Sequence, residues 1–246
     1  MSRTLSFLLS LLLTLPALSQ GRSYDDLLVM YVDENYEKCI DKAERYASKD
    51  ETRRDAMPYL YLSMCYHEMS KLEKYTMQKE YKYAARDALK FAVKYRKKDK
   101  ELAFFKNFED HWSELNTVAF ETGYYYMDLK AFSKAKRQYA RMVGYMPENP
   151  GAWQMLALTQ LNMNLQRDAA QSLAQYDTSM AAIPDLSGLP PDQLKLLRGS
   201  MVRYADYLVA KGQTQKARDV VARCKDVFME IPEFKALYEQ LNKGAG

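Results

Sequence analysis

A helical repeat of 34 residues is the feature of this sequence that most limits the folds open to it. Residues 153–176 read as two short helices, each with apolar residues at three- and four-residue spacing, joined by a polar turn. Residues 119–147 have the same layout, so that Ala135 stands 34 residues before Ala169, and residues 204–224 repeat it a third time. A chain that repeats one hairpin at this period is expected to stack its hairpins, because each unit buries its apolar faces against its neighbours.

The best copy, residues 123–150 (GYYYMDLKAFSKAKRQYARMVGYMPENP), resembles the tetratricopeptide repeat, or TPR. It has the small residue of the first helix, an aromatic residue one turn later, the alanine of the second helix and a closing proline. Residues 35–46 resemble a further second helix, and residues 59–66 the first helix of the next unit. The resemblance implies an all-α fold, an α-solenoid of about five TPR-like helical hairpins with two insertions.

The two insertions lie where the repeat spacing fails. Residues 71–100 are predicted to form one long helical segment with an apolar side. Residues 177–191 contain three prolines and a glycine, which indicates an irregular loop, and Asp192 with Gln193 then suits the start of a helix.

The first twenty residues are typical of an export signal. Arg3 precedes an apolar run at residues 5–15, and Pro16-Ala17-Leu18-Ser19 supplies a helix break and small residues before Gln20. We therefore expect a signal peptide at 1–19 and a mature TPR-like domain at 20–246, with no integral membrane segment after cleavage. The expected location is a bacterial periplasm, with secretion as the second choice.

The resemblance also implies a binding site on the concave side of the stack, formed by first-helix residues. The partner-binding residues expected there are Phe120, Glu121, Tyr124, Met127, Asp128, Gln154, Leu158, Asn162, Arg203 and Asp206. Phe120, Tyr124 and Leu158 would be the apolar centre of the site, with Glu121, Asp128, Asn162 and Arg203 as its polar surroundings. Tyr126 is assigned to the core instead. The alternative is that another segment of the same chain covers these side chains.

A second candidate surface is the basic segment 71–100, which has eleven Lys and Arg against four Asp and Glu. This net charge of +7 would suit an acidic partner or an anionic lipid surface. The interpretation we favour is a solvated helix face, because long charged helices are common. Export argues against nucleic acid as a partner.

No catalytic or metal-binding pattern is found. His67-Glu68 begins like a zinc-protease helix but lacks the second histidine four residues after the first, and His111 stands alone. Adjacent carboxylates such as Glu109 and Asp110 diverge on a helix. No enzyme activity, metal or cofactor is therefore expected.

The three cysteines are expected to be buried free thiols, since Cys39 and Cys224 stand at core positions. A bridge between Cys39 and Cys65 stays open as the alternative, because sequence does not fix connectivity.

Together these features predict a non-enzymatic scaffold, adaptor or assembly factor in a cell-envelope complex, with protein partners and peripheral envelope association. Two alternatives remain: an accessory protein that captures a peptide or glycan for uptake, and the helical subunit of an enzyme whose active subunit is a separate chain.

Overall fold

The chain is all-α. A computed structural model describes residues 23–243, which form thirteen α-helices and two 3₁₀ helices and contain no β-strand. The α-helices are α1 (Asp25–Val32), α2 (Tyr36–Ser48), α3 (Met57–Lys71), α4 (Glu73–Thr76), α5 (Ala84–Lys98), α6 (Glu109–Asp128), α7 (Phe132–Tyr145), α8 (Pro150–Asn162), α9 (Gln166–Ala181), α10 (Pro191–Ala210), α11 (Thr214–Ala222), α12 (Lys225–Phe228) and α13 (Pro232–Asn242), and the 3₁₀ helices are η1 (Phe105–Phe108) and η2 (Leu186–Gly188). The predicted signal peptide at 1–19 lies outside the described residues.

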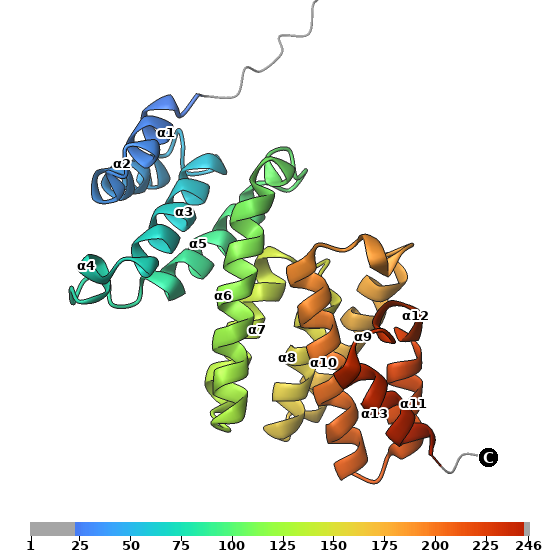
Figure 1. Cartoon of the computed structure of the whole chain (residues 1–246). Coiled ribbons are helices and arrows are strands. Elements are labelled where there is room, and N and C mark those ends of the chain that lie inside the picture. Colours follow the sequence, from blue (N-terminus) through green and yellow to red (C-terminus); the bar gives the residue numbers. More distant parts are fainter. Residues whose placement is uncertain (1–22, 244–246) are drawn as a thin grey trace, which may run out of the picture.

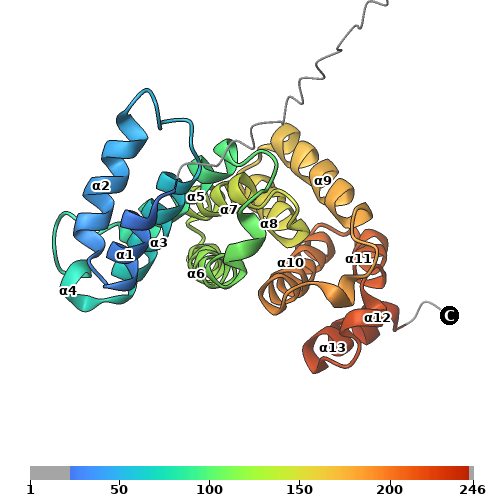
Figure 2. The same cartoon turned by 90° about the horizontal axis from the view of Figure 1, so that it is seen from above.

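The helices are arranged as a solenoid-like stack of hairpins. Successive helices lie side by side from α1 at one end to α11–α13 at the other (Figure 1, Figure 2). The hairpins are α1/α2, α3/α5, α6/α7, α8/α9 and α10/α11, which agrees with the predicted all-α solenoid. Between residues 23 and 243, no helix is both long and apolar enough to cross a membrane.

Four of the five hairpins close with the same three-residue turn. Its middle residue is left-handed in each case: Glu34 (φ 57°), Lys130 (φ 54°), Asn164 (φ 58°) and Gly212 (φ 73°). In each turn the next N–H donates to a carbonyl five residues earlier: Asn35 to Met30, Ala131 to Tyr126, Leu165 to Gln160 and Gln213 to Leu208. This pattern satisfies carbonyls left free at the helix C-terminus. The repeated hairpin seen in the sequence is therefore repeated in the backbone, and two of the turns are 34 residues apart.

Small residues predicted to let helices approach one another are buried. Ala135, Ala169, Ala205 and Ala217 have no exposed surface. The largest buried side chain is Trp112 on α6, whose ring stacks on Phe105 at a centroid distance of 4.8 Å. The repeat thus predicted correctly that these four small residues are buried.

The prediction of one long helix at 71–100 is wrong. Helix α3 ends at Lys71 because Leu72 is extended (φ −105°, ψ 120°), and turns separate the short α4 from α5. The apolar side was predicted correctly from residue 84 onward, since Ala84, Ala88, Phe91 and Tyr95 are buried. The loop predicted before Asp192 is shorter than expected, because α9 continues to Ala181, and α10 begins at Pro191 as expected.

All three cysteines are buried free thiols, as predicted. Cys39 on α2 lies next to α1, where its Sγ is 3.5 Å from the carbonyl oxygen of Leu27. Burial raises the pKa of the Cys224 thiol to about 12. A thiol whose pKa is raised in this way is unreactive near neutral pH.

Candidate functional site: a basic pocket beside a closed groove

The expected concave groove is filled by α10. Three residues of α10, spaced by four, lie along α6: Lys195, Gly199 and Arg203. The Lys195 ammonium lies 4.8 Å from the ring centre of Phe120 and 3.5 Å from the carboxylate of Glu121. Farther along, the Arg203 guanidinium lies 4.6 Å from the ring centre of Tyr124. The alternative was that another segment of the same chain covers these side chains. That segment is α10.

Several predicted partner-binding residues are consequently not on the surface. Phe120, Met127, Gln154 and Leu158 are buried, so the expectation that they face outward is wrong. The physical reason is that α10 packs across both α8 and α6, which removes these first-helix faces from water. Gln154 shows the effect directly, because its Oε1 accepts a hydrogen bond of 2.7 Å from Ser200 of α10.

Tyr124 and Tyr126, which the repeat assigns to opposite faces, are both partly buried and both pack against the hydrophobic core. Tyr124 packs against Gly199 so closely that a Cβ added to this glycine would lie 1.9 Å from the tyrosine hydroxyl oxygen. Burial raises the pKa of Tyr124 to about 12, with the charges of Arg203 and Arg198 opposing the shift. Tyr126 is partly buried and lines an open pocket on another side of α6.

The remaining predicted site residues are engaged or scattered. Asp128 forms an ion pair of 2.8 Å with Arg203, and the side-chain amide of Asn162 donates to the Leu158 carbonyl oxygen at 2.8 Å. Glu121 and Asp206 are exposed. These residues do not converge on one cavity, so the concave site predicted from the repeat is not assembled.

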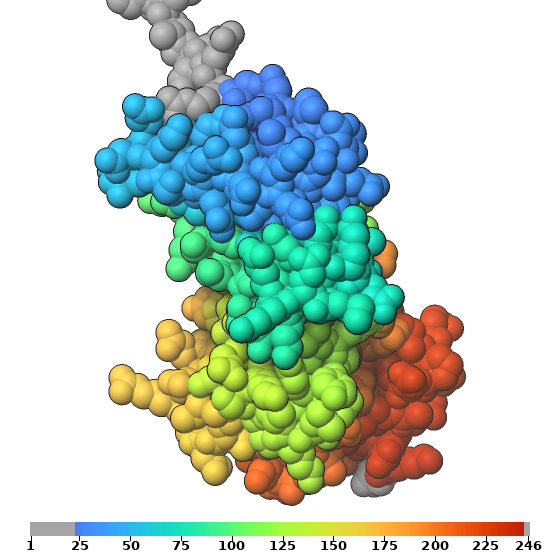
Figure 3. All heavy atoms as spheres, turned by 90° about the vertical axis from the view of Figure 1, so that its left-hand side faces the viewer, coloured from blue at the N-terminus to red at the C-terminus, as the bar shows by residue number. Residues whose placement is uncertain are grey.

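An open pocket lies instead between the beginning of α5, the end of α6 and helix α7. It measures about 580 Å³. Its lining consists of Lys82, Tyr83, Ala85, Arg86, Thr122, Tyr126, Lys134, Arg137, Gln138 and Arg141. In Figure 3 the teal surface near residue 75 meets the yellow-green surface of the α6–α7 region. We call this cavity the basic pocket.

Helical spacing places the basic residues of α7 on one wall. Lys134, Arg137, Gln138 and Arg141 are separated by three and four residues, so they share a face of the helix about 10 Å long. Lys82 and Arg86 come from the opposite wall. Five of the ten lining residues are Lys or Arg, and none is acidic.

The positive charge in the basic pocket is poorly compensated. Arg86 pairs with Asp87 at 3.2 Å, whereas within residues 23–243 no carboxylate pairs with Lys82, Lys134, Arg137 or Arg141. Burial lowers the pKa of Arg141, and the charges of Arg86 and Arg137 lower it further. Guanidinium groups that repel one another in a concave site favour a bound anion.

Aromatic and apolar side chains border these cations. The Arg86 guanidinium lies 4.4 Å from the ring centre of Tyr83, and the Lys134 ammonium lies 5.5 Å from that of Tyr126. Two large side chains next to Tyr126 are exposed. Tyr125 of α6 has 60% of its surface exposed, and Leu129, which follows the end of α6, has 59%. Exposed aromatic residues beside arginines are typical of protein-binding surfaces.

The sequence contains both halves of the basic pocket, but in two separate segments. One half is the charge excess at 71–100, of whose cations only Lys82 and Arg86 reach the pocket. The other half is the stripe at residues 134, 137 and 141 on a repeat helix. The solvated-face interpretation of 71–100 does not hold for Lys82 and Arg86, because both line the pocket opposite α7.

A second polar cluster joins α3 to α6 and contains both histidines of the chain. The ring centres of His67 and His111 are 5.6 Å apart. His67 Nε2 lies 3.1 Å from Glu114 Oε2, and His111 Nε2 lies 3.2 Å from the Ser63 hydroxyl. The sequence showed these histidines as isolated, because 43 residues separate them. Ser63 has no exposed surface, so a substrate could not reach its hydroxyl in this arrangement.

The histidines predict a pH dependence of stability. Burial lowers the pKa of His111 to about 3, and the positive charges of His67 and Lys71 contribute. Burial also lowers the pKa of His67. The unfolded chain therefore binds protons that the folded chain does not, and stability should be lost as pH falls from about 6.5, by at most about 1.4 kcal/mol per pH unit for each histidine.

Urea unfolding at pH 7.5, 6.5, 5.5 and 4.5, in the presence of EDTA, would measure this loss. His111→Gln should flatten the profile between pH 6.5 and 4.5. Glu114, whose pKa is lowered first by its hydrogen bond with Lys71, contributes only below about pH 4.5. An unchanged slope in the variant would contradict the prediction.

Comparison with known proteins adds no relative: no family model matches the chain, and no match was found among curated proteins or solved structures.

Proposed function

We propose that the protein is an exported, TPR-like, non-enzymatic adaptor that docks an acidic segment of an envelope protein in the basic pocket. The observation that carries the proposal is the convergence of five Lys and Arg side chains without an acidic lining residue. Three of these five residues are arginines, and a guanidinium group can form two parallel hydrogen bonds with a carboxylate. The all-α hairpin stack is a fold that commonly presents such binding surfaces.

A protein partner is favoured over a small anion by the surroundings of the pocket. Tyr125 and Leu129 offer an apolar contact beside the cations, which a free anion would not use. The pocket volume of about 580 Å³ would also hold a short anionic peptide or glycan. Capture of such a ligand is therefore the second candidate function.

Removing two charges from the pocket tests the proposal. A fluorescent ten-residue glutamate peptide should bind the full chain, more weakly as salt is raised. The double variant Arg137→Gln/Arg141→Gln should lose about tenfold or more in affinity. Its free energy of unfolding should stay the same or rise by up to about 1 kcal/mol, because the mutual repulsion is relieved.

A matched control separates the pocket from overall charge. Lys216→Gln/Lys235→Gln removes the same charge from exposed positions on α11 and α13. This control should bind the peptide like the unmodified chain. If both double variants lost the same affinity for the peptide, net charge alone would explain the binding, and the assignment to the pocket would be wrong.

A further inference from the structure

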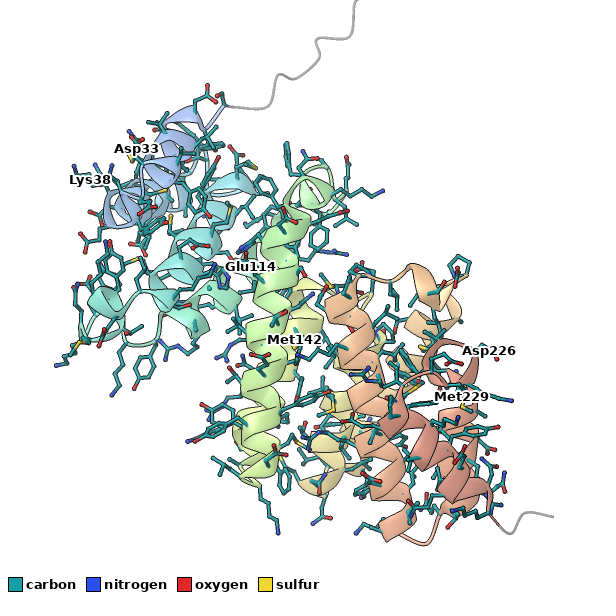
Figure 4. The ribbon with its side chains drawn as sticks, viewed as in Figure 1. Asp33, Lys38, Glu114, Met142, Asp226 and Met229 are labelled. Carbon is teal, nitrogen blue, oxygen red and sulfur yellow. The ribbon has the colours of Figure 1, made fainter. Side chains whose placement is uncertain are left out.

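A mixed cluster of one imidazole and two carboxylates lies between α3 and α6, away from the basic pocket. His67 and Glu68 are adjacent on α3, and Glu114 on α6 (labelled in Figure 4) lies near both. One ligand atom from each residue lies within 4.8 Å of the others. The pair His67 Nε2 and Glu114 Oε2 is already only 3.1 Å apart.

These distances suit a transition metal ion. Zinc is bound by histidine nitrogen and carboxylate oxygen at about 2.0–2.2 Å, so that neighbouring ligand atoms lie about 3–3.5 Å apart. The carboxylates can close the remaining distance by rotation, because the Glu114 side chain is 55% exposed and that of Glu68 is 25% exposed. The imidazole ligand favours zinc over magnesium or calcium, which prefer oxygen ligands.

The position between the two carboxylates already holds a cation. The Lys71 ammonium lies 2.8 Å from Glu68 Oε1 and 2.5 Å from Glu114 Oε2. This lysine ends α3 and its side chain is 40% exposed, so it can turn into water and leave the carboxylates to another ion. A metal ion and Lys71 would therefore compete for the same oxygens.

The surroundings of the cluster leave room for an ion. Open pockets of about 290 and 240 Å³ flank the cluster, and Glu114 lines both of them. An ion could enter through either pocket with water as its remaining ligands.

We propose that His67, Glu68 and Glu114 bind one zinc ion per chain, in competition with the Lys71 ammonium. The site is independent of the adaptor function and of the basic pocket. Three protein ligands leave at least one position open to water, which is the arrangement of reactive or exchangeable zinc sites rather than of closed structural ones.

Titration of the full chain, without an affinity tag, with zinc chloride at pH 7.5 tests the site. Calorimetry should show one ion per chain. Glu114→Gln should weaken binding about tenfold or more by removing an anionic ligand. Lys71→Met should strengthen it about tenfold, because the competing ammonium is gone. Glu109→Gln changes an exposed glutamate of the same helix and should bind like the unmodified chain.

The histidines give a second readout. Because the chain has only two, two imidazole signals are expected in the NMR spectrum, and zinc should shift the signal of His67 strongly. The result that overturns the proposal is any one of three: no zinc binding by the unmodified chain, equal binding by folded Glu114→Gln, or no gain in Lys71→Met. Circular dichroism of each variant establishes that it is folded.

Discussion

Replacing Asn116 with alanine is expected to lower the free energy of unfolding by about 3 kcal/mol or more. Asn116 is 1% exposed and connects three helices. Its amide nitrogen donates to Asp192 of α10 at 2.8 Å, and its carbonyl oxygen accepts a 2.6 Å hydrogen bond from Tyr145 of α7. The alanine would leave a buried carboxylate and a buried phenol each short of a partner.

Asp192 makes this loss larger than that of an ordinary hydrogen bond. It is buried, and its second oxygen accepts a hydrogen bond of 3.0 Å from Ser113. A charged acceptor that loses its partner keeps the cost of leaving water without the compensating bond.

A neighbouring hydroxyl serves as the control. Thr117 lies on the same helix, and its hydroxyl bonds only locally, to the Ser113 carbonyl oxygen. Thr117→Ala should cost less than about 1 kcal/mol in urea unfolding. Similar losses for Asn116→Ala and Thr117→Ala would show that the network between α6, α7 and α10 does not hold the stack together.

Adding one methyl group at Gly151 is expected to destabilise the chain by about 1–3 kcal/mol or more. Gly151 lies in the first turn of α8, where the helix touches the backbone of α10. A Cβ there would lie 2.7 Å from the Leu197 nitrogen and 2.9 Å from the Leu196 carbonyl carbon. Since backbone atoms cannot rotate away, Gly151→Ala must push α8 and α10 apart.

Gly188 provides the matched substitution. It lies in the 3₁₀ helix before α10, and a Cβ there would meet nothing within 4 Å. Gly188→Ala should change the free energy of unfolding by less than about 0.5 kcal/mol. Thermal melts of the two alanine variants would check the comparison, and equal melting temperatures would contradict the close contact of α8 with α10.

The repeated hairpin could be predicted from the sequence because its signals are local. The spacing of Ala135 and Ala169 indicated the period, and the turns at Lys130 and Asn164 have the same backbone conformation. The end of α3 was missed since no proline or glycine marks it, and Leu72 is extended without any local sequence requirement.

The path of α10 could not be predicted from local signals. Whether α10 lies beside α8 alone or also crosses α6 depends on contacts between residues far apart in the chain, such as Arg203 with Asp128. That crossing buried Phe120 and Leu158, which the repeat pattern left exposed. The same kind of distant contact brings Arg86 toward Arg141 and His67 toward His111, which are separate in the sequence.

We propose that the partner binds in the basic pocket and not in the concave groove. Affinity capture from native cell envelopes, read out by mass spectrometry, tests this. It compares three chains: the unmodified chain, Arg137→Gln/Arg141→Gln and Lys216→Gln/Lys235→Gln. We expect the unmodified chain and the control to recover the same envelope protein, bearing an acidic segment, and the pocket variant to lose it. Equal recovery of that protein by all three chains would contradict the claim.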